Sequence, residues 1–183
     1  MRLFIGVELD DEVKARAAAI ADALREKLGR GVTARWISPD NLHITLWFIG
    51  EVPDDRAAGI IEAVNAPFAT SSFDLELHGA GVFPPHGPPR VLWIGVADGQ
   101  QSMIALYNEL AARLQPLGVE PERRAYSAHL TIARIKTWPH RAKRLDGEVA
   151  DAGRCRITAV TVFRSRLSPK GASYEPLLRV PLV

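Results

Sequence analysis

The chain contains one short motif twice, and both copies lie in similar surroundings. His43-Ile44-Thr45-Leu46 and His129-Leu130-Thr131-Ile132 lie 86 residues apart, each inside an apolar run. Side chains at positions i and i+2 of a strand share one face of the sheet. We therefore expect the histidine and threonine of each copy to point the same way, with the aliphatic residues turned into a core.

The two motifs belong to a longer pattern that occurs twice in the same order. An apolar run leads into a stretch with helical spacing, the motif follows, and a segment of alternating apolar and polar residues comes last. The matched segments are 4–7 with 92–96, 10–28 with 99–117, and 73–77 with 157–163. Offsets of 84 to 88 residues indicate a duplicated unit, with repeats of approximately 1–88 and 89–183 in one 183-residue domain.

A duplicated strand–helix–strand unit is expected to pack as two lobes related by a pseudo-twofold axis. Elements at such an axis meet their own copies, which would bring His43 and His129 to opposite sides of one cleft. Each imidazole must then reach an oxygen of the same phosphate group, which requires a separation of about 5–8 Å.

The composition is that of an ordinary globular protein. It is 47% hydrophobic and 24% charged, and no run of 18 apolar residues could span a membrane. Cys155 is the only cysteine, which excludes an intrachain disulfide and a thiolate metal cluster. We expect a cytoplasmic monomer that has no membrane anchor.

Charge is unevenly distributed, although the net charge is only +2. Residues 1–92 contain 9 Lys and Arg against 13 Asp and Glu, whereas residues 93–183 contain 14 against 8. A basic half favours an anionic partner, and a solvated basic surface is the alternative. The cations beside the second motif, which could follow an RNA backbone, are Arg123, Arg124, Lys136, Arg141, Lys143 and Arg144.

The paired histidines and threonines suit acid–base chemistry on a phosphate ester. A histidine can act as a base or an acid near neutral pH, and a threonine hydroxyl can donate to a phosphate oxygen. We therefore assign His43 and His129 as catalytic, and Thr45 and Thr131 as substrate-binding. The remaining histidines, interpreted as structural or surface residues, are His78, His86 and His140.

No set of metal ligands accompanies the motifs. Zinc needs three or four His, Cys or carboxylate ligands, and no carboxylate lies on the histidine face beside either motif. The chain also lacks a glycine-rich phosphate loop and a Gly-x-Ser-x-Gly elbow. We expect neither a metal nor another cofactor.

Three further residues flank the motifs in positions that strand geometry alone does not assign. Strict alternation puts Arg134 on the face opposite Thr131, and only a bulge or the end of the strand would bring it to the site. Trp36 and Tyr126 lie next to the motif strands, where an aromatic ring either stacks on a base or packs at the rim of the core.

Over nearly its whole length the chain resembles the two-histidine (2H) phosphoesterases, specifically the RNA 2′,3′-cyclic phosphodiesterases historically called 2′-5′ RNA ligases. The segments that carry the resemblance are 2–7, 36–52, 81–84, 90–96, 129–134 and 165–171. The first motif with its flanks is highly specific. Two positions depart from the family pattern, because Ala128 stands where proline is usual and Tyr126 where phenylalanine is common.

The resemblance implies an α+β, bilobal fold in which two antiparallel sheets with outer helices flank a central cleft. It implies hydrolysis of a terminal 2′,3′-cyclic phosphate to a 2′-phosphomonoester, and it places Arg134 at the phosphate. We count Tyr126 with the substrate-binding residues. The implied substrate is RNA with such an end, for instance a tRNA fragment, or a small cyclic nucleotide.

The roles of the two histidines are assigned from nearby charges. Asp40 and Glu51 lie near His43 in the sequence and favour its imidazolium form, whereas Arg134 favours neutral His129. His43 is therefore our acid and His129 our base, which agrees with the resemblance.

Two alternatives to hydrolysis stay open. One is the reverse reaction, an ATP-independent 2′-5′ RNA ligase, which water at about 55 M disfavours unless a paired RNA holds the 5′-hydroxyl. The other is a non-catalytic module that binds RNA ends, for which two titrating groups are not needed.

Overall fold

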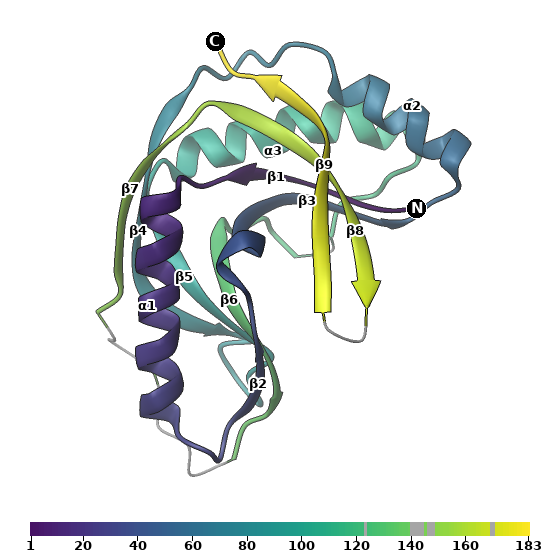
Figure 1. Ribbon diagram of the computed structural model, residues 1–183. Coiled ribbons are helices and arrows are strands. Elements are labelled where there is room, and N and C mark those ends of the chain that lie inside the picture. The colour runs from purple at the N-terminus through teal and green to yellow at the C-terminus, as the bar shows by residue number, and fades with distance from the viewer. Residues whose placement is uncertain (123, 140–144, 146–148, 169–170) are drawn as a thin grey trace.

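The computed structural model describes residues 1–122, 124–139, 145, 149–168 and 171–183 (Figure 1). Within them, nine strands form one curved antiparallel sheet in the order β7-β4-β5-β6-β3-β1-β8-β9, with β2 paired to β6 beside this path. Their bounds are β1 Arg2–Glu8, β2 Thr33–Trp36, β3 His43–Glu51, β4 Phe73–Phe83, β5 Val91–Asp98, β6 His129–Thr137, β7 Asp151–Ile157, β8 Ala159–Ser168 and β9 Gly171–Pro181.

Three α-helices lie against this sheet (Figure 1). They are α1 Asp11–Leu28, α2 Asp54–Val64 and α3 Gln100–Leu114, and short 3₁₀ turns occur at η1 Pro39–Asn41 and η2 Gln115–Leu117. Helix α1 contacts β7 and β6, whereas α3 contacts β3 and α2. Helix α1 therefore covers the half of the sheet that contains β7 and β6, and α3, with α2 against it, covers the half that contains β3.

The sheet consists of two similar halves that meet at β3 and β6. A single residue pair, Ile44 with Leu130, joins them. Outward from this pair the order is β3-β1-β8-β9 on one side and β6-β5-β4-β7 on the other. The α+β class and the duplicated antiparallel arrangement are thus confirmed, and the pair joins the two expected sheets into one.

Each half of the sheet contains strands from both sequence repeats. Strand β4, from the first repeat, pairs with β5 of the second, and β8, from the second, pairs with β1 of the first. The repeats therefore exchange a strand as they pack. The surroundings of each motif are for this reason built partly by the other repeat.

Local sequence explains where α1 begins and ends. The Asp10 side chain accepts a hydrogen bond of 2.8 Å from the backbone N–H of Val13, which caps the first turn. Gly29 adopts φ 68°, a left-handed conformation that suits glycine, and ends the helix. Its buried positions recur at helical spacing and are Val13, Ala17, Ala21, Leu24 and Leu28.

Alternation along the strands separates a core face from an open face. Leu3, Ile5 and Val7 of β1 are fully buried. Ile44 and Leu130, the aliphatic residues of the two motifs, are also fully buried, as the motif pattern predicts. No helix of the described residues is long and apolar enough to cross a membrane.

Candidate active site

The Ile44–Leu130 pair brings the two motifs together. This is the only pair of β3 and β6 among the described residues, and antiparallel geometry puts Thr45 and His129 on one side of it and His43 and Thr131 on the other. Directly opposite Cβ atoms in such ladders are about 4.5–5.5 Å apart. Because the paired aliphatic side chains point into the core, the four polar side chains share the open face.

A β-bulge in β6 decides where Arg134 points. Leu92 of β5 pairs with Ala133 and Trp93 pairs with Thr131, so Ile132 is the extra residue. An extra residue reverses the alternation beyond it. Arg134 is accordingly exposed between buried neighbours and returns to the face of His129 and Thr131. Strict alternation, which puts Arg134 on the opposite face, is therefore wrong here.

The same bulge occurs in β3. Gly6 of β1 pairs with Thr45 and Ile5 pairs with Trp47, which leaves Leu46 as the extra residue. Beyond it Trp47 turns into the core at 2% exposure, whereas Phe48 lies on the open face at 43%. Strand alternation in the sequence did not predict that Phe48 lies at the site. The signal was its position, 86 residues before Arg134, the same offset as between the histidines.

His43 is held on two sides by hydrogen bonds. Its Nδ1 lies 2.7 Å from the carbonyl oxygen of Asn41, and its Nε2 lies 3.1 Å from the hydroxyl of Thr45. A carbonyl oxygen only accepts, so Nδ1 carries the proton and Nε2 of the neutral ring accepts from the threonine. Burial lowers the pKa of His43 to about 4, and the charge of Arg134 acts in the same direction.

Aromatic rings account for the burial of His43. The rings of Phe4, Tyr174 and Phe163 have centroids 4.7, 5.0 and 5.9 Å from that of the imidazole. Phe163 and Tyr174 belong to β8 and β9, which come from the second repeat. The strand exchange therefore surrounds His43 with apolar surface that disfavours its charged form.

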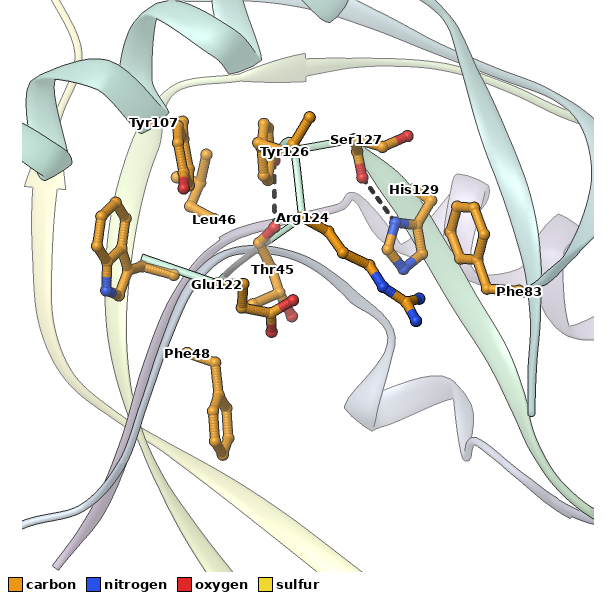
Figure 2. Close-up of a pocket in the computed structure, with 12 residues that line it drawn as sticks. Thr45, Leu46, Phe48, Phe83, Tyr107, Glu122, Arg124, Tyr126, Ser127 and His129 are labelled. Carbon is orange, nitrogen blue, oxygen red and sulfur yellow. Dashed lines mark hydrogen bonds between the residues drawn. The ribbon is translucent and has the colours of Figure 1, made fainter. Parts of the chain in front are cut away.

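His129 is oriented in the same way but lies in more polar surroundings. Its Nδ1 donates to the carbonyl oxygen of Ser127 at 2.7 Å, as Figure 2 shows, and the ring of Phe83 meets it edge-on at 5.0 Å. Burial lowers the pKa of His129, Glu122 raises it and Arg134 lowers it. In the described part of the chain no side chain or carbonyl bonds to its Nε2, which leaves this atom available to a substrate.

The charges near each histidine differ from those that sequence proximity suggested. Asp40 and Glu51 are not among the groups that shift the pKa of His43. Arg134 lowers the pKa of both imidazoles, and the carboxylate that favours a charged ring, Glu122, acts on His129. The premise that made His43 the acid is therefore wrong.

Tyr126 bridges the gap where β3 and β6 diverge. Its hydroxyl donates to the carbonyl oxygen of Thr45 at 3.1 Å (Figure 2), and its ring stacks on Tyr107 at 4.5 Å. Burial raises the pKa of Tyr126, so the hydroxyl stays protonated. The other aromatic candidate, Trp36, ends β2 opposite Ala133 of β6, is partly buried against the core and does not line the pocket beside Tyr126.

A pocket of about 210 Å³ opens beside Tyr126 and contains both Thr45 and His129 in its lining (Figure 2). Of the cations beside the second motif, Arg124 lines this pocket and Lys136 is exposed on β6. The other candidates lie outside the described residues: Arg123, Arg141, Lys143 and Arg144, together with His140. Within the described part, no three His, Cys, Asp or Glu gather as a metal site. Metal independence stays a prediction.

Comparison with known proteins agrees with this geometry. A family model described as LigT like phosphoesterase matches the chain twice, over residues 7–93 and 94–174. The chain belongs to the LigT-like phosphoesterase family. Each copy of the model contains one His-x-Thr strand, as expected for a duplicated family.

Several relatives are similar over almost the whole chain. The RNA 2′,3′-cyclic phosphodiesterase of Archaeoglobus fulgidus is 35% identical over 187 residues, which cover 97% of this chain and 98% of the relative. The corresponding protein of Thermotoga maritima is 31% identical over 179 residues, or 97% and 93% of the two chains.

Solved structures show the same fold. A Thermus thermophilus protein of 28% identity superimposes with a TM-score of 0.82 and covers 100% of this chain and 98% of its own. LigT of E. coli reaches a TM-score of 0.79 at 24% identity, with 99% and 97% covered, and supports the fold alone.

Proposed function

We propose that this protein is an RNA 2′,3′-cyclic phosphodiesterase that uses two histidines as acid and base. The observation that carries the proposal is the Ile44–Leu130 pair, because it sets both His-Thr pairs on one open face. The relatives that share nearly the whole chain bear the name of this activity. LigT-like phosphoesterases are the family to which the chain belongs.

The reaction needs one proton removed and one delivered. A neutral imidazole takes a proton from water as its oxygen bonds to phosphorus, and an imidazolium protonates the ribose oxygen as the P–O bond breaks. Both rings have Nδ1 fixed by a backbone carbonyl, which leaves Nε2 for this exchange. Each proton transfer is worth about 10²–10⁴-fold in rate.

Neutral and cationic donors hold the phosphate in this proposal. The hydroxyls of Thr45 and Thr131 and the guanidinium of Arg134 bind the non-bridging oxygens, whose charge grows in the transition state. Arg134 lies opposite Arg35 of β2, and in the described ranges neither has a carboxylate partner. Like charges directly opposite destabilise a sheet, and a bound phosphate anion relieves this repulsion.

The charges in the free protein favour His129 as the ring that is protonated first, the reverse of the assignment from sequence. A phosphate anion between the rings raises both pKa values. The orientation of the substrate then decides which ring delivers the proton. Release of a 2′-phosphomonoester requires that the protonated ring face the 3′ oxygen.

The test is incubation with an oligoribonucleotide that ends in a 2′,3′-cyclic phosphate, in EDTA and without added metal. We expect conversion to a 2′-phosphate, identified by chromatography against both isomers. His78→Ala is the matched control, because His78 is exposed and lies outside the site. Binding without turnover would instead indicate an RNA-end binding module, and joining to a 5′-hydroxyl strand would indicate a ligase.

Complete loss of activity in EDTA, restored by zinc or manganese, would contradict the metal-free mechanism. A cytoplasmic location and a monomeric state are further proposals, made from the sequence. Gel filtration with light scattering tests the monomer, and cell fractionation tests the location. The natural RNA, whether a tRNA fragment or another cyclic-phosphate end, is left to the same assay with different substrates.

A further inference from the structure

Arg35 is an exposed arginine beside the catalytic residues that has no part in the proton transfers. It lies on β2 directly opposite Arg134 of β6, so the two side chains share the open face of the sheet and their Cβ atoms are about 4.5–5.5 Å apart. In the part of the chain that the structure describes, neither guanidinium is paired with a carboxylate. Two unpaired cations side by side are the arrangement expected where more than one anion binds.

The guanidinium of Arg35 extends from one half of the sheet to the other. Strand β2 pairs with β6, whereas β9 belongs to the half that contains β3. A Cβ atom placed on Gly171, the first residue of β9, would lie only 3.0 Å from Nη2 of Arg35. Three residues further along β9, the ring of Tyr174 packs edge-on against that of His43 at 5.0 Å. Arg35 therefore lies at the strand that forms one wall around His43.

Arg35 and Arg134 are adjacent but not equivalent. The charge of Arg134 lowers the pKa of both imidazoles, whereas Arg35 is not among the groups that shift either pKa. The one carboxylate of β9, Glu175, does not neutralise Arg35, because it accepts hydrogen bonds from Arg164 and Arg166 of β8. Arg35 is therefore free to bind an anion other than the one between the histidines.

An RNA strand carries such an anion next to its cyclic phosphate. The nucleotide with the 2′,3′-cyclic phosphate is joined through its 5′ oxygen to the preceding nucleotide by a phosphodiester. A nucleoside 2′,3′-cyclic phosphate lacks this group. A guanidinium donates two parallel hydrogen bonds to the oxygens of a phosphate, so Arg35 has the chemistry to distinguish the two kinds of substrate.

We propose that Arg35 binds the phosphodiester on the 5′ side of the nucleotide that carries the cyclic phosphate. The inference rests on the proposed function. Arg134 holds the reacting phosphate and Arg35 the neighbouring one, which also relieves the repulsion between the two cations. The protein therefore prefers the ends of RNA strands to nucleoside 2′,3′-cyclic phosphates.

The experiment measures KM and kcat of the parent and of Arg35→Gln on three substrates. Adenosine 2′,3′-cyclic phosphate has no 5′ phosphate, its 5′-phosphorylated form has a terminal one, and uridylyl-(3′→5′)-adenosine 2′,3′-cyclic phosphate has a phosphodiester. Loss of a hydrogen bond to a charged group at an exposed position predicts a KM increase of about 10-fold on the last two substrates only. The value of kcat should not change, because the contact is equally present in the ground state and the transition state.

Two further variants separate recognition from structure. Arg35→Lys keeps the charge without the forked geometry and should give an intermediate KM on the substrates with a 5′ phosphate. Arg25→Gln is the matched control, because it removes an exposed arginine from α1 and should leave every KM unchanged. On an oligoribonucleotide with a cyclic-phosphate end, the slope of log KM against log salt concentration should fall by about 0.7 in Arg35→Gln, the value for one lost phosphate contact in a single strand.

An equal KM change on all three substrates would place Arg35 at the reacting phosphate and overturn the inference, as would no change on any. A change on only one of the two substrates with a 5′ phosphate would also overturn it, since both carry the anion. If Arg35→Gln does not fold, Arg35→Lys gives the same comparison with the same criteria.

Failure of the proposed function itself gives a different result. If the parent hydrolyses none of the three substrates, that function is wrong. The binding of the 5′ phosphate is then tested by calorimetry with adenosine 2′,5′-bisphosphate against adenosine 2′-monophosphate. Tighter binding of the bisphosphate by the parent, lost in Arg35→Gln, supports the inference, and equal affinities contradict it.

Discussion

The two His-Thr strands have the same sequence pattern but different surroundings. His43 lies among three aromatic rings and its Nε2 is already bonded to Thr45. His129 meets one edge-on ring and feels the opposing charges of Glu122 and Arg134. The backbone geometry is repeated, since each Nδ1 donates to the carbonyl two residues earlier, whereas the electrostatics is not.

This contrast shows how a duplicated motif can divide acid and base roles between identical residues. Each motif determines which face of the sheet its histidine occupies, which ring nitrogen carries the proton, and the threonine hydroxyl beside it. The protonation preference comes from side chains that other strands and loops bring, such as Tyr174 for His43 and Glu122 for His129. Removal of single side chains should therefore affect the two halves unequally.

The largest effect should follow loss of either imidazole. We expect His43→Ala and His129→Ala each to lower kcat by about 10²–10⁴-fold on the cyclic-phosphate oligonucleotide, because each removes one proton transfer. RNA affinity should change little. Each variant should lose a different limb of the bell-shaped pH–rate profile, which assigns acid and base. Near-full activity in either variant would rule out a catalytic role for that histidine.

Arg134 should rank next, because it acts on both halves at once. Arg134→Gln should lower kcat by about 10²–10³-fold, the usual cost of one lost donor to a developing oxyanion. Since the arginine lowers the pKa of both imidazoles, its loss should raise both pKa values and move the acidic limb of kcat/KM to higher pH. Lys136 is an exposed cation on the same strand, and Lys136→Gln is therefore the control. It should change neither kcat nor the acidic limb of kcat/KM.

The partly buried His43 should make the fold sensitive to acid. His43 has a pKa of about 4 when folded against about 6.5 when unfolded, so between these values the unfolded chain binds more protons and stability rises with pH. Acidification from pH 7 to 4 should therefore lower the free energy of unfolding by about 3 kcal/mol through this residue. Urea titrations at pH 7 and pH 4 of the parent, His43→Gln and His129→Gln measure this loss of unfolding free energy. An equal loss in the two variants would refute the difference between the two histidines.

The smallest of these effects should come from the threonines. Thr45→Ala and Thr131→Ala should each lower kcat by about 10- to 100-fold, because each removes one hydrogen bond to a charged oxygen and no proton transfer. Thr45→Ala should also raise the pKa of His43, since the hydroxyl donates to the neutral ring. NMR titration of the imidazole checks this shift, and Thr45→Ser should restore the parent value.

Much of the site followed from local pattern alone. The two-residue period of a strand predicted that each histidine shares a face with its threonine and that Ile44 and Leu130 are buried. The constant offset predicted the duplication that the family model also matches. Arg134 and Phe48 did not follow, because one extra residue in each strand reverses the alternation, and only the pairing with β5 and β1 reveals it.

The sequence by itself thus determined the duplication, the motif faces and the chemistry of the side chains, because these depend on short-range spacing and residue type. The tertiary structure alone decided the protonation preferences and the pocket. Both depend on residues far apart in the chain: Phe163 and Tyr174 desolvate His43 from strands of the other repeat, and Glu122 acts on His129 from a loop. Desolvation and Coulomb interaction depend on distance in space, which sequence proximity does not measure.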